Sequence, residues 1–245
     1  MQYIKGLDAF DGRNHTAVTL GKFDGLHRGH QKLLNRIMKY AKKEDCDSVV
    51  CAFDMDRDCL MTNEERRAFL EDKVDYLIEI PFTREMMEME AEKFIDEILY
   101  KKLHASHIVV GTDFNFGHEK RGNHQMLEKY AAKYGYTVDV VEKAYYKDRE
   151  ISSTYIRELL LDGNVPLANE LLGYPYEITS VVEHGQQLGR TLGFPTMNLA
   201  PQGKKILPKY GVYACRVLVD GVWYGGVGNA GVKPTVAQEK RRLFE

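Results

Sequence analysis

The sequence predicts an α/β domain with a parallel sheet, followed by a smaller antiparallel β domain. Strand-like and helix-like segments alternate from residue 17 to about residue 141, and repeated βα units imply a parallel sheet covered by helices. After about residue 173 glycine becomes frequent and short β-rich runs dominate, which indicates a small antiparallel barrel. We therefore expect domains of residues 1–172 and 173–245.

Apolar runs mark the expected strands of the first domain, which are residues 17–20, 48–53, 76–80, 108–110 and 137–141. The first helix begins near His30, and the second is opened by Thr62 and Glu65, which have capping-box spacing. The inner face of a third helix, after Pro81, carries Met86, Met89, Phe94, Ile98 and Leu99. A fourth helix is expected near residues 124–134.

A further helix, opened by Ser152 and ending near Gly163, leads to the second domain. The strands expected there are residues 177–182, 213–219 and 222–224. Asp220 and Gly221 separate the last two runs, and this pair is typical of a tight hairpin turn.

The overall composition fits a cytoplasmic enzyme. The net charge of −2 gives no sign of a general nucleic-acid binder. No apolar run approaches the roughly 20 residues that span a bilayer, and the amino terminus lacks a signal-peptide core. The four cysteines form no Cys-x-x-Cys pair, so we expect small buried thiols. The sequence carries no signal for an oligomeric state.

The segment Gly21–His30 is the strongest candidate for chemistry. It joins an expected strand to an expected helix, and His27 and His30 lie on either side of Gly29 where that helix begins. Free N–H groups and the helix dipole favour an anion there, and imidazoles can hydrogen-bond phosphate oxygens. We expect a nucleotide site. The alternatives are local capping by the histidines, or zinc, for which no third ligand follows at suitable spacing.

A second cluster, Gly111–Gly117, follows an expected strand, where a doubly wound sheet places its binding residues. Phe114 and Phe116 alternate with polar groups, which suits a planar aromatic ligand held by stacking and a few hydrogen bonds. Arg121, close by in sequence, could meet a phosphate. The alternative is that both phenylalanines fill the core.

Ser152, Ser153 and Thr154 place hydroxyls at a helix start, with Arg157 one turn further on, again a pattern suited to phosphate. The alternative is an ordinary N-cap with a surface arginine.

The glycine-rich segment 185–198 is a fourth cluster, with Arg190 in a loop able to cover phosphates. Thr196 and Asn198 share a face in extended chain, and their oxygens could help to hold Mg²⁺. No Gly-Lys-Ser/Thr is present, so this is not a Walker motif. The alternative is ordinary hairpin turns.

Together these clusters resemble one family, the bacterial bifunctional riboflavin kinase/FMN adenylyltransferases, or prokaryotic FAD synthetases. The segment Leu20–His30 is similar to the first adenylyltransferase motif, and Val110–Gly117 to the flavin-side loop. The segment Ile151–Thr154 with Arg157 resembles the ATP-side motif. Leu188–Asn198, with residues 211–213 and 229–235, looks like the kinase signature.

The resemblance implies a Rossmann-like nucleotidyltransferase domain that makes FAD and pyrophosphate from ATP and FMN. It also implies a β-barrel riboflavin kinase domain that makes FMN from riboflavin and ATP with Mg²⁺. The catalytic residues would be His27, His30 and Glu245. The nucleotide would contact Gly21, Phe23, Asp24, Gly25, Gly29, Ser153, Thr154, Arg157, Gly189 and Arg190. The flavin would contact Asp113, Phe114, Phe116 and Arg121, and the metal Thr196 and Asn198.

The chain departs from the family pattern in two places. The family reads Phe-x-Pro-His-Pro after its second strand, whereas Phe53–Arg57 carries Asp56 where the histidine is expected. The family also continues beyond the catalytic glutamate, whereas this sequence stops at Glu245, so we expect either a truncated product or an incomplete barrel. These departures leave three alternatives open: one inactive module, another nucleotidyltransferase of the same fold, or a flavin- or nucleotide-binding protein without catalysis.

Overall fold

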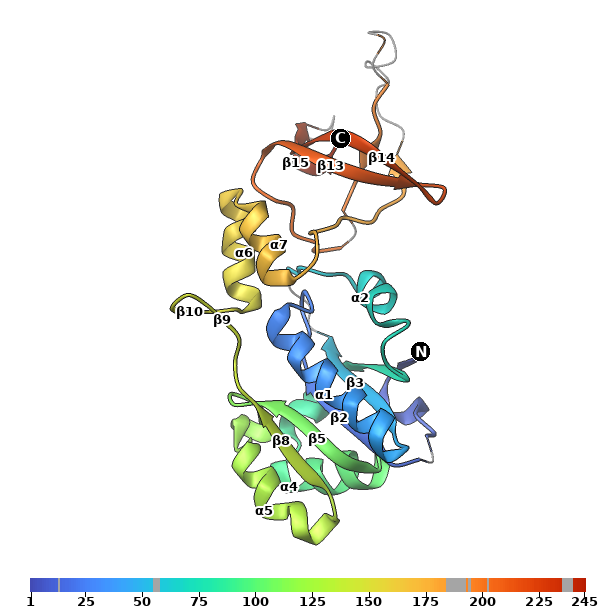
Figure 1. The fold of residues 1–245 in the computed structure, drawn as a ribbon, viewed down its shortest axis with the longest axis vertical. Helices are drawn as coiled ribbons and strands as arrows, with labels where there is room; N and C mark the ends of the chain where they lie inside the picture. Colours follow the sequence, from blue (N-terminus) through green and yellow to red (C-terminus); the bar gives the residue numbers. More distant parts are fainter. Residues whose placement is uncertain (13, 55–57, 184–192, 194, 202, 235–239) are drawn as a thin grey trace. The chain divides into compact units, whose positions relative to one another are not determined.

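The computed structural model describes the chain except for residues 13, 55–57, 184–192, 194, 202 and 235–239 (Figure 1). It forms two compact units, and each is described by itself. The first unit contains Met1–Asp56 and Asn63–Ile151, and the second contains Arg57–Thr62 and Ser152–Glu245. The expected boundary between residues 172 and 173 stays a prediction, since the compact units divide after Ile151.

The first unit contains the expected parallel sheet, with strand order β1-β4-β3-β2-β5-β8. The strands are β1 (Gln2–Lys5), β2 (Thr16–Gly21), β3 (Asp47–Asp54), β4 (Tyr76–Pro81), β5 (Ala105–Gly111) and β8 (Thr137–Val141). Strand β1 was not expected because it is short and half polar. It joins the sheet by parallel pairing with β4, where Ile4 lies opposite Ile78.

Strand β2 occupies the position at which the chain reverses its direction across the sheet. The chain runs from β2 to β3 and β4 on one side, and then returns to β5 and β8 on the other. Val18 of β2 lies opposite Val49 on β3 and Ile108 on β5. In a sheet of this kind, ligands bind beyond the carboxyl ends of the strands at such a switch point.

Helices cover both faces of this sheet. Right-handed crossovers place α1 (Arg28–Glu44) and α2 (Asn63–Leu70) on one face, and α5 (His124–Tyr134) on the other. The second face is also covered by α4 (Ala91–Lys93) and the π-helix η2 (Phe94–Lys102), which follow the short α3 (Arg84–Glu88). A single helix after Pro81 was therefore a wrong prediction. Met89 is extended, because its carbonyl accepts a hydrogen bond from His118 N at 2.7 Å.

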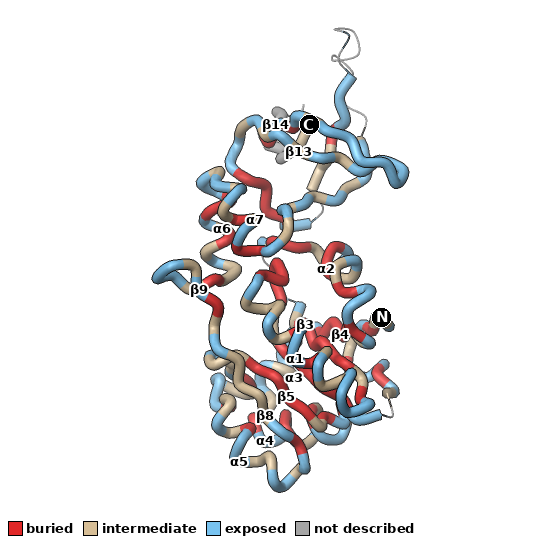
Figure 2. Tube along the Cα trace, viewed as in Figure 1, coloured by how far each residue is buried: buried red, intermediate tan, exposed pale blue. Residues whose placement is uncertain are grey.

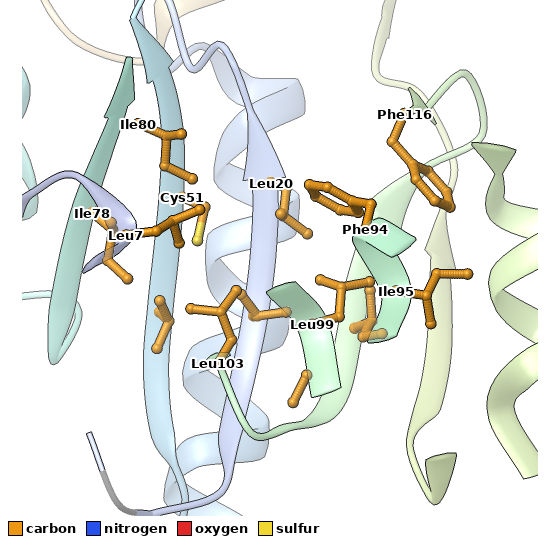
Figure 3. Packing of buried hydrophobic residues seen from close by; sticks show 14 of the residues in the cluster. Leu7, Leu20, Cys51, Ile78, Ile80, Phe94, Ile95, Leu99, Leu103 and Phe116 are labelled. Atoms are coloured by element: carbon orange, nitrogen blue, oxygen red, sulfur yellow. The ribbon is translucent and has the colours of Figure 1, made fainter. Parts of the chain in front are cut away.

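The core of the first unit lies between the sheet and η2. Figure 2 shows β4 and β5 buried along most of their length. Figure 3 shows Phe94 packed between Leu20 of β2 and Phe116, with Leu99 further along the same helix. Full burial of each such side chain contributes about 1.5–3 kcal/mol, so this face stabilises the carboxyl edge of the sheet.

The second unit begins with α6 (Ser153–Asp162) and α7 (Val165–Leu172). An antiparallel sheet follows, with order β11-β12-β15-β14-β13, as expected for the β domain. Its strands are β11 (Val182–Glu183), β12 (Asn198–Leu199), β13 (Gly211–Val219), β14 (Val222–Pro234) and β15 (Lys240–Phe244). The expected strand at 177–182 was wrong in extent, because pairing with β12 involves only Val182 and Glu183.

The predicted hairpin is confirmed between β13 and β14. Asp220 and Gly221 have φ values of 48° and 79°, as a two-residue turn with both residues in the left-handed region requires.

A short strap of chain, Asp58–Thr62, belongs to the second unit although it lies between β3 and α2 in sequence. Cys59 forms a parallel bridge with Lys205. The Lys205 side chain is buried and donates from Nζ to the Leu60 carbonyl at 2.7 Å. Arg157 Nη2 donates to the Asp58 carbonyl at 3.3 Å. Within the described ranges, no helix has the length and apolar character needed to cross a membrane.

Candidate active site

The turn between β2 and α1 carries both histidines and is held in an unusual backbone conformation. Phe23 and Leu26 have φ values of 47° and 36°, and Gly25 has a φ of 80°. Positive φ at a bulky residue costs on the order of 1–3 kcal/mol and persists only where the surroundings enforce it. Both apolar side chains are fully buried, so packing enforces this turn.

The imidazoles of His27 and His30 are stacked, with ring centroids 3.8 Å apart and an interplanar angle of 22°. His27 is the N-cap residue of α1, but its side chain makes no capping hydrogen bond, so the local-capping alternative does not explain it. Both Nδ1 atoms are buried without a hydrogen-bond partner among the described residues. Buried polar atoms are usually paired, so these two atoms make the histidines candidates for contact with a ligand.

Both histidines are neutral at pH 7. Burial lowers the pKa of His27 to about 4. Burial, followed by the nearby His27 and the Arg66 guanidinium, lowers the pKa of His30 well below its ordinary value. A hydrogen on Nδ1 would be a buried donor without an acceptor, so the tautomer with hydrogen on Nε2 is favoured. The Nε2–H groups are therefore the donors available to a phosphate.

The other residues expected in this turn lie around the histidines. A Cβ on Gly29 would lie 3.1 Å from Cε1 and Nδ1 of His27, so only glycine lets the ring lie against the helix backbone. A Cβ on Gly21 would contact the Phe23 ring at 3.4 Å. Asp24 is buried. The structure thus brings together Gly21, Phe23, Asp24, Gly25, His27, Gly29 and His30.

The loop expected to bind flavin begins at the carboxyl end of β5, the neighbour of β2. It contains a two-residue antiparallel pair, β6 (Asn115–Phe116) with β7 (Gly122–Asn123). The Asp113 side chain is exposed, and its Oδ2 lies 3.0 Å from Lys143 Nζ. Because β2 and β5 are adjacent and parallel, this loop and the histidine turn open from the same edge of the sheet.

Phe116 is a core residue, only 7% exposed. Its ring centroid lies 5.3 Å from that of Phe94 and 5.6 Å from that of Phe114. A Cβ on Gly122 would lie 2.6 Å from the Phe116 ring. Core packing, the alternative reading of the sequence, therefore accounts for Phe116. Phe114 is half-buried, and contact of either ring with a flavin stays a prediction.

Arg121 is exposed and forms ion pairs with Glu119 and, at 3.8 Å, with Glu90. Ion pairs at such exposed positions contribute little to stability, so a ligand phosphate could compete for this guanidinium.

A buried charge cluster next to the histidine turn was not foreseen from the sequence. Glu79 of β4 is buried, and its Oε1 lies 3.5 Å from Nη2 of the buried Arg66. Its Oε2 lies 3.3 Å from Arg67 Nη2 and accepts a 2.6 Å hydrogen bond from the Tyr3 hydroxyl. Burial, together with Glu79, raises the pKa of Tyr3 to about 12, so this donor stays protonated. A glutamate within the apolar run 76–80 was the available signal.

Lys143 was also missed. Its Nζ lies 2.8 Å from Glu150 Oε2 and 3.0 Å from Asp113 Oδ2, and the hydrogen bond to Glu150 is the main cause of its raised pKa. No sequence pattern links these positions, which meet only through the fold.

The phosphate cluster predicted at residues 152–157 lies at the start of α6 in the second unit. Ser152 is the N-cap, and its Oγ accepts from Tyr155 N at 3.2 Å, so the capping alternative accounts for this residue. Ser153 and Thr154 occupy the first turn, with Arg157 on the same helix. Their contact with a nucleotide stays a prediction.

Two of the predicted kinase residues meet in the second unit. Thr196 Oγ1 donates to Glu245 Oε1 at 2.7 Å. The backbone of Glu245 pairs with Asn229 through two hydrogen bonds of 2.7 and 3.0 Å. Asn198 on β12 is buried. Gly189, Arg190 and Asp56 lie outside the described residues.

The donors at this site suit a hard cation. A hydroxyl, a carboxylate and an amide oxygen are the ligand types that Mg²⁺ takes together with nucleotide phosphates. Among the residues that the structure describes, no group of three or more His, Cys, Asp or Glu side chains could hold a metal ion.

Comparisons with known proteins give two matches along the chain. Residues 11–155 match the family model of FAD synthetase, and residues 172–245 match that of riboflavin kinase.

Three relatives are named bifunctional riboflavin kinase/FMN adenylyltransferase. The protein from Buchnera aphidicola subsp. Schizaphis graminum is 35% identical, over 100% of this chain and 83% of its own length. The Escherichia coli K12 protein is 36% identical, over 92% of this chain and 76% of its own. The Haemophilus influenzae protein is 36% identical, over 96% of this chain and 80% of its own length.

The chain is also similar over its whole length to a solved structure. The crystal structure of a macrolide-efflux protein from Streptococcus pneumoniae covers 100% of this chain and 83% of its own, with a TM-score of 0.87 and 30% identity.

Proposed function

The chain belongs to the FAD synthetase family, and from that premise we propose that it makes FAD in two steps. It phosphorylates riboflavin to FMN with ATP, and it then transfers an adenylyl group from a second ATP to FMN. The observation that carries the second step is the stacked, neutral pair of His27 and His30 at the start of α1, whose Nδ1 atoms have no hydrogen-bond partner among the described residues.

In adenylyl transfer, an FMN phosphate oxygen attacks the α-phosphorus of ATP. A new P–O bond forms to FMN, and the bond from the α-phosphorus to the bridging oxygen breaks, releasing pyrophosphate. The Nε2–H groups of His27 and His30 donate to phosphate oxygens as charge shifts toward the leaving group. The free N–H groups at the start of α1 add further positive electrostatic potential at the phosphates. No covalent intermediate is needed, because positioning and electrostatics supply the catalysis.

The residues around the histidines shape the nucleotide site. We assign the backbone of Gly21, Gly25 and Gly29 to close approach of the phosphates, with Phe23 and Asp24 fixing the turn. Ser153, Thr154 and Arg157 are assigned to the nucleotide. Asp113, Phe114 and Arg121 are assigned to the flavin side, with Phe116 supporting the Phe114 ring from the core.

In riboflavin phosphorylation, Glu245 accepts the proton of the 5′-hydroxyl as that oxygen attacks the γ-phosphorus of ATP and ADP leaves. The hydrogen bond from Thr196 supports this role, because it orients the carboxylate. Thr196 and Asn198 would hold Mg²⁺, which neutralises phosphate charge when bound. Gly189 and Arg190 are assigned to the phosphates from the sequence.

We assign this chemistry to the cytoplasm and to small-molecule substrates, with no nucleic-acid partner. The net charge of −2 supports small-molecule substrates. The four cysteines are free thiols, which is typical of a reducing compartment.

One assay separates this proposal from its alternatives. The protein is incubated with riboflavin and Mg-ATP, or with FMN and Mg-ATP, and the flavins are separated by chromatography. Riboflavin converted to FMN and then FAD supports both steps. FMN alone, or FAD only from supplied FMN, identifies a single active unit. If neither FMN nor FAD forms, the proposal is contradicted and a binding protein without catalysis is favoured.

A further inference from the structure

We propose that Arg66 is a positioning residue for adenylyl transfer, because its guanidinium ties the histidine turn to a buried carboxylate of the sheet. The inference rests on the proposed function and adds to it a residue outside both phosphate-binding motifs. It is carried by the contacts of Arg66, by the strained turn that it holds and by the ring contacts that lead from this turn to His27.

The guanidinium of Arg66 bridges three elements of the first unit. The residue lies on α2 and is 5% exposed. Its Nη1 donates to the Lys22 carbonyl at 3.1 Å. Its Nη2 lies 3.5 Å from Glu79 Oε1 on β4 and donates to Asn63 Oδ1. Arg66 reaches the carbonyl and the carboxylate with two different nitrogens of one rigid plane, a geometry that the single nitrogen of a lysine does not reproduce.

The carbonyl that Arg66 holds lies at the start of the strained part of the turn. Lys22 immediately precedes Phe23, whose φ is 47°. The far end is held separately, because Gln31 Nε2 donates to the Leu26 carbonyl at 2.8 Å. A strained segment keeps its conformation only while its surroundings enforce it. Loss of the Arg66 contact would therefore leave the first half of the turn held by packing alone.

A chain of ring contacts carries this restraint to the histidines. The Phe23 ring lies 5.2 Å from the His30 ring, at an interplanar angle of 59°. The His30 ring stacks on His27 at 3.8 Å. Any shift of Phe23 therefore changes the surface against which the His30 ring packs, and His27 stacks on that ring. Misplacement by about 1 Å can reduce a rate by on the order of 100-fold, so this restraint is sufficient to matter.

The charge of Arg66 also helps to keep His30 in its proposed role. A buried cation near His30 disfavours a second positive charge, and it is one cause of the lowered pKa of that histidine. His30 is thereby kept as a neutral donor. Stability alone is a weak explanation for the pair of Arg66 and Glu79, since buried ion pairs are often no more stabilising than apolar residues.

The sequence offers a matched control at the next position. Arg67 binds the same Glu79 carboxylate at 3.3 Å, but its guanidinium lies over the Tyr3 ring. Arg66→Lys keeps the charge and removes the fork near the histidines, whereas Arg67→Lys makes the same change away from them.

We expect Arg66→Lys to lower kcat for FAD formation from FMN by about 10- to 100-fold, with KM for FMN within about twofold of the parent. Arg67→Lys should stay within about twofold of the parent in kcat. Riboflavin phosphorylation by the same samples reports on the second unit and should not change. Equal losses in both variants, or a change in KM alone, would overturn the proposal.

A second measurement does not depend on FAD synthesis. In protein labelled with ¹³C at histidine Cε1, Arg66→Lys should shift the His27 and His30 ring signals and leave His107 unchanged. Arg67→Lys should shift none of them. Unshifted rings in Arg66→Lys would refute the positioning role, even if the parent protein made no FAD and the proposed function had failed.

If Arg66→Lys does not fold, the double variant Arg66→Gln with Glu79→Gln takes its place. It removes both charges of the pair, so neither partner is left buried and charged alone. It should show the same loss of kcat and the same shifts of the histidine signals. Parent-like rates and ring signals in a folded double variant would contradict the proposal.

Discussion

The ring of His27 lies on the ring of His30 at 3.8 Å, and neither Nδ1 atom has a hydrogen-bond partner in the described part of the chain. A charge on one ring would face the other ring directly, so stacking and burial favour two neutral rings, which the proposed function uses as two donors. Such donors can bind a polyanion without first taking up protons, and they need not give up a proton afterwards.

His30→Ala should lower the rate of FAD formation by about 10- to 100-fold, the scale for losing one donor that stabilises developing charge. Binding of FMN should change little, since its expected loop follows β5. Steady-state FAD formation and a flavin-fluorescence titration measure the two effects. An unchanged rate in a folded variant would show that His30 does not contact phosphate.

The free energy of unfolding should fall as the pH falls from about 6.5 to about 4. The pKa of His27 is lowered to about 4 in the folded protein, against about 6.5 unfolded, so between these values only the unfolded chain takes up the proton. The contribution is complete above about pH 6.5 and amounts to about 3 kcal/mol. Urea unfolding at several pH values measures this contribution, and His27→Gln should make the pH dependence less steep while leaving the part that comes from His30. If the free energy of unfolding of that variant depends on pH as steeply as in the parent, groups other than His27 cause the dependence.

Gly29→Ala should impair FAD formation without unfolding the protein. The new Cβ would lie 3.1 Å from the His27 ring, which must move by a few tenths of an ångström. The helix itself gains about 1 kcal/mol from alanine, so thermal stability should hold or rise. Arg28→Ala, an exposed neighbour on the same helix, is the control. Parent-like rates for Gly29→Ala would mean that the ring position is not critical.

Glu245→Gln should lower FMN formation from riboflavin by about 100- to 10,000-fold, the range for a general base. The amide keeps the shape and can still accept from Thr196, but it cannot take the proton. FAD formation from supplied FMN should stay unchanged. Robust riboflavin phosphorylation by this variant would require another base in the second unit.

Asp56→His should lower the KM for ATP in FAD formation. A carboxylate with an ordinary pKa of about 3.9 is ionised at neutral pH and repels a triphosphate. Initial rates over a range of ATP concentrations test this expectation. If the variant binds ATP no better, Asp56 is a working part of the site.

Much of the first unit could be predicted because its elements have strong local patterns. Helix α5 and strand β8 begin and end at the expected residues, since Gly135 ends the helix and an apolar run forms the strand. The break at Met89 could not be predicted, because its cause is a hydrogen bond to His118, which lies far along the chain. Strand β1 gains its stability from β4, not from its own sequence.

The histidine turn was visible in the sequence because its glycines and histidines are contiguous. The pair of Arg66 and Glu79 was not visible in the sequence, because these residues meet only when α2 packs near β4 in the folded protein. Phe116 was assigned to ligand from its alternation with polar residues, whereas Phe94 and Phe114 pack against it. Local sequence can place a binding loop, but it cannot tell which ring of the loop faces inward.

The strap Asp58–Thr62 means that the two units are interleaved along the gene rather than joined end to end. A fragment of residues 152–245 would lack the Leu60 carbonyl, and the buried Lys205 ammonium would lose an acceptor at a cost of about 1–3 kcal/mol. Exchange of this unit between relatives would therefore have to carry the strap as well. Cleavage after residue 151 would divide the polypeptide, but the strap of the second unit would stay on the fragment that carries the first unit.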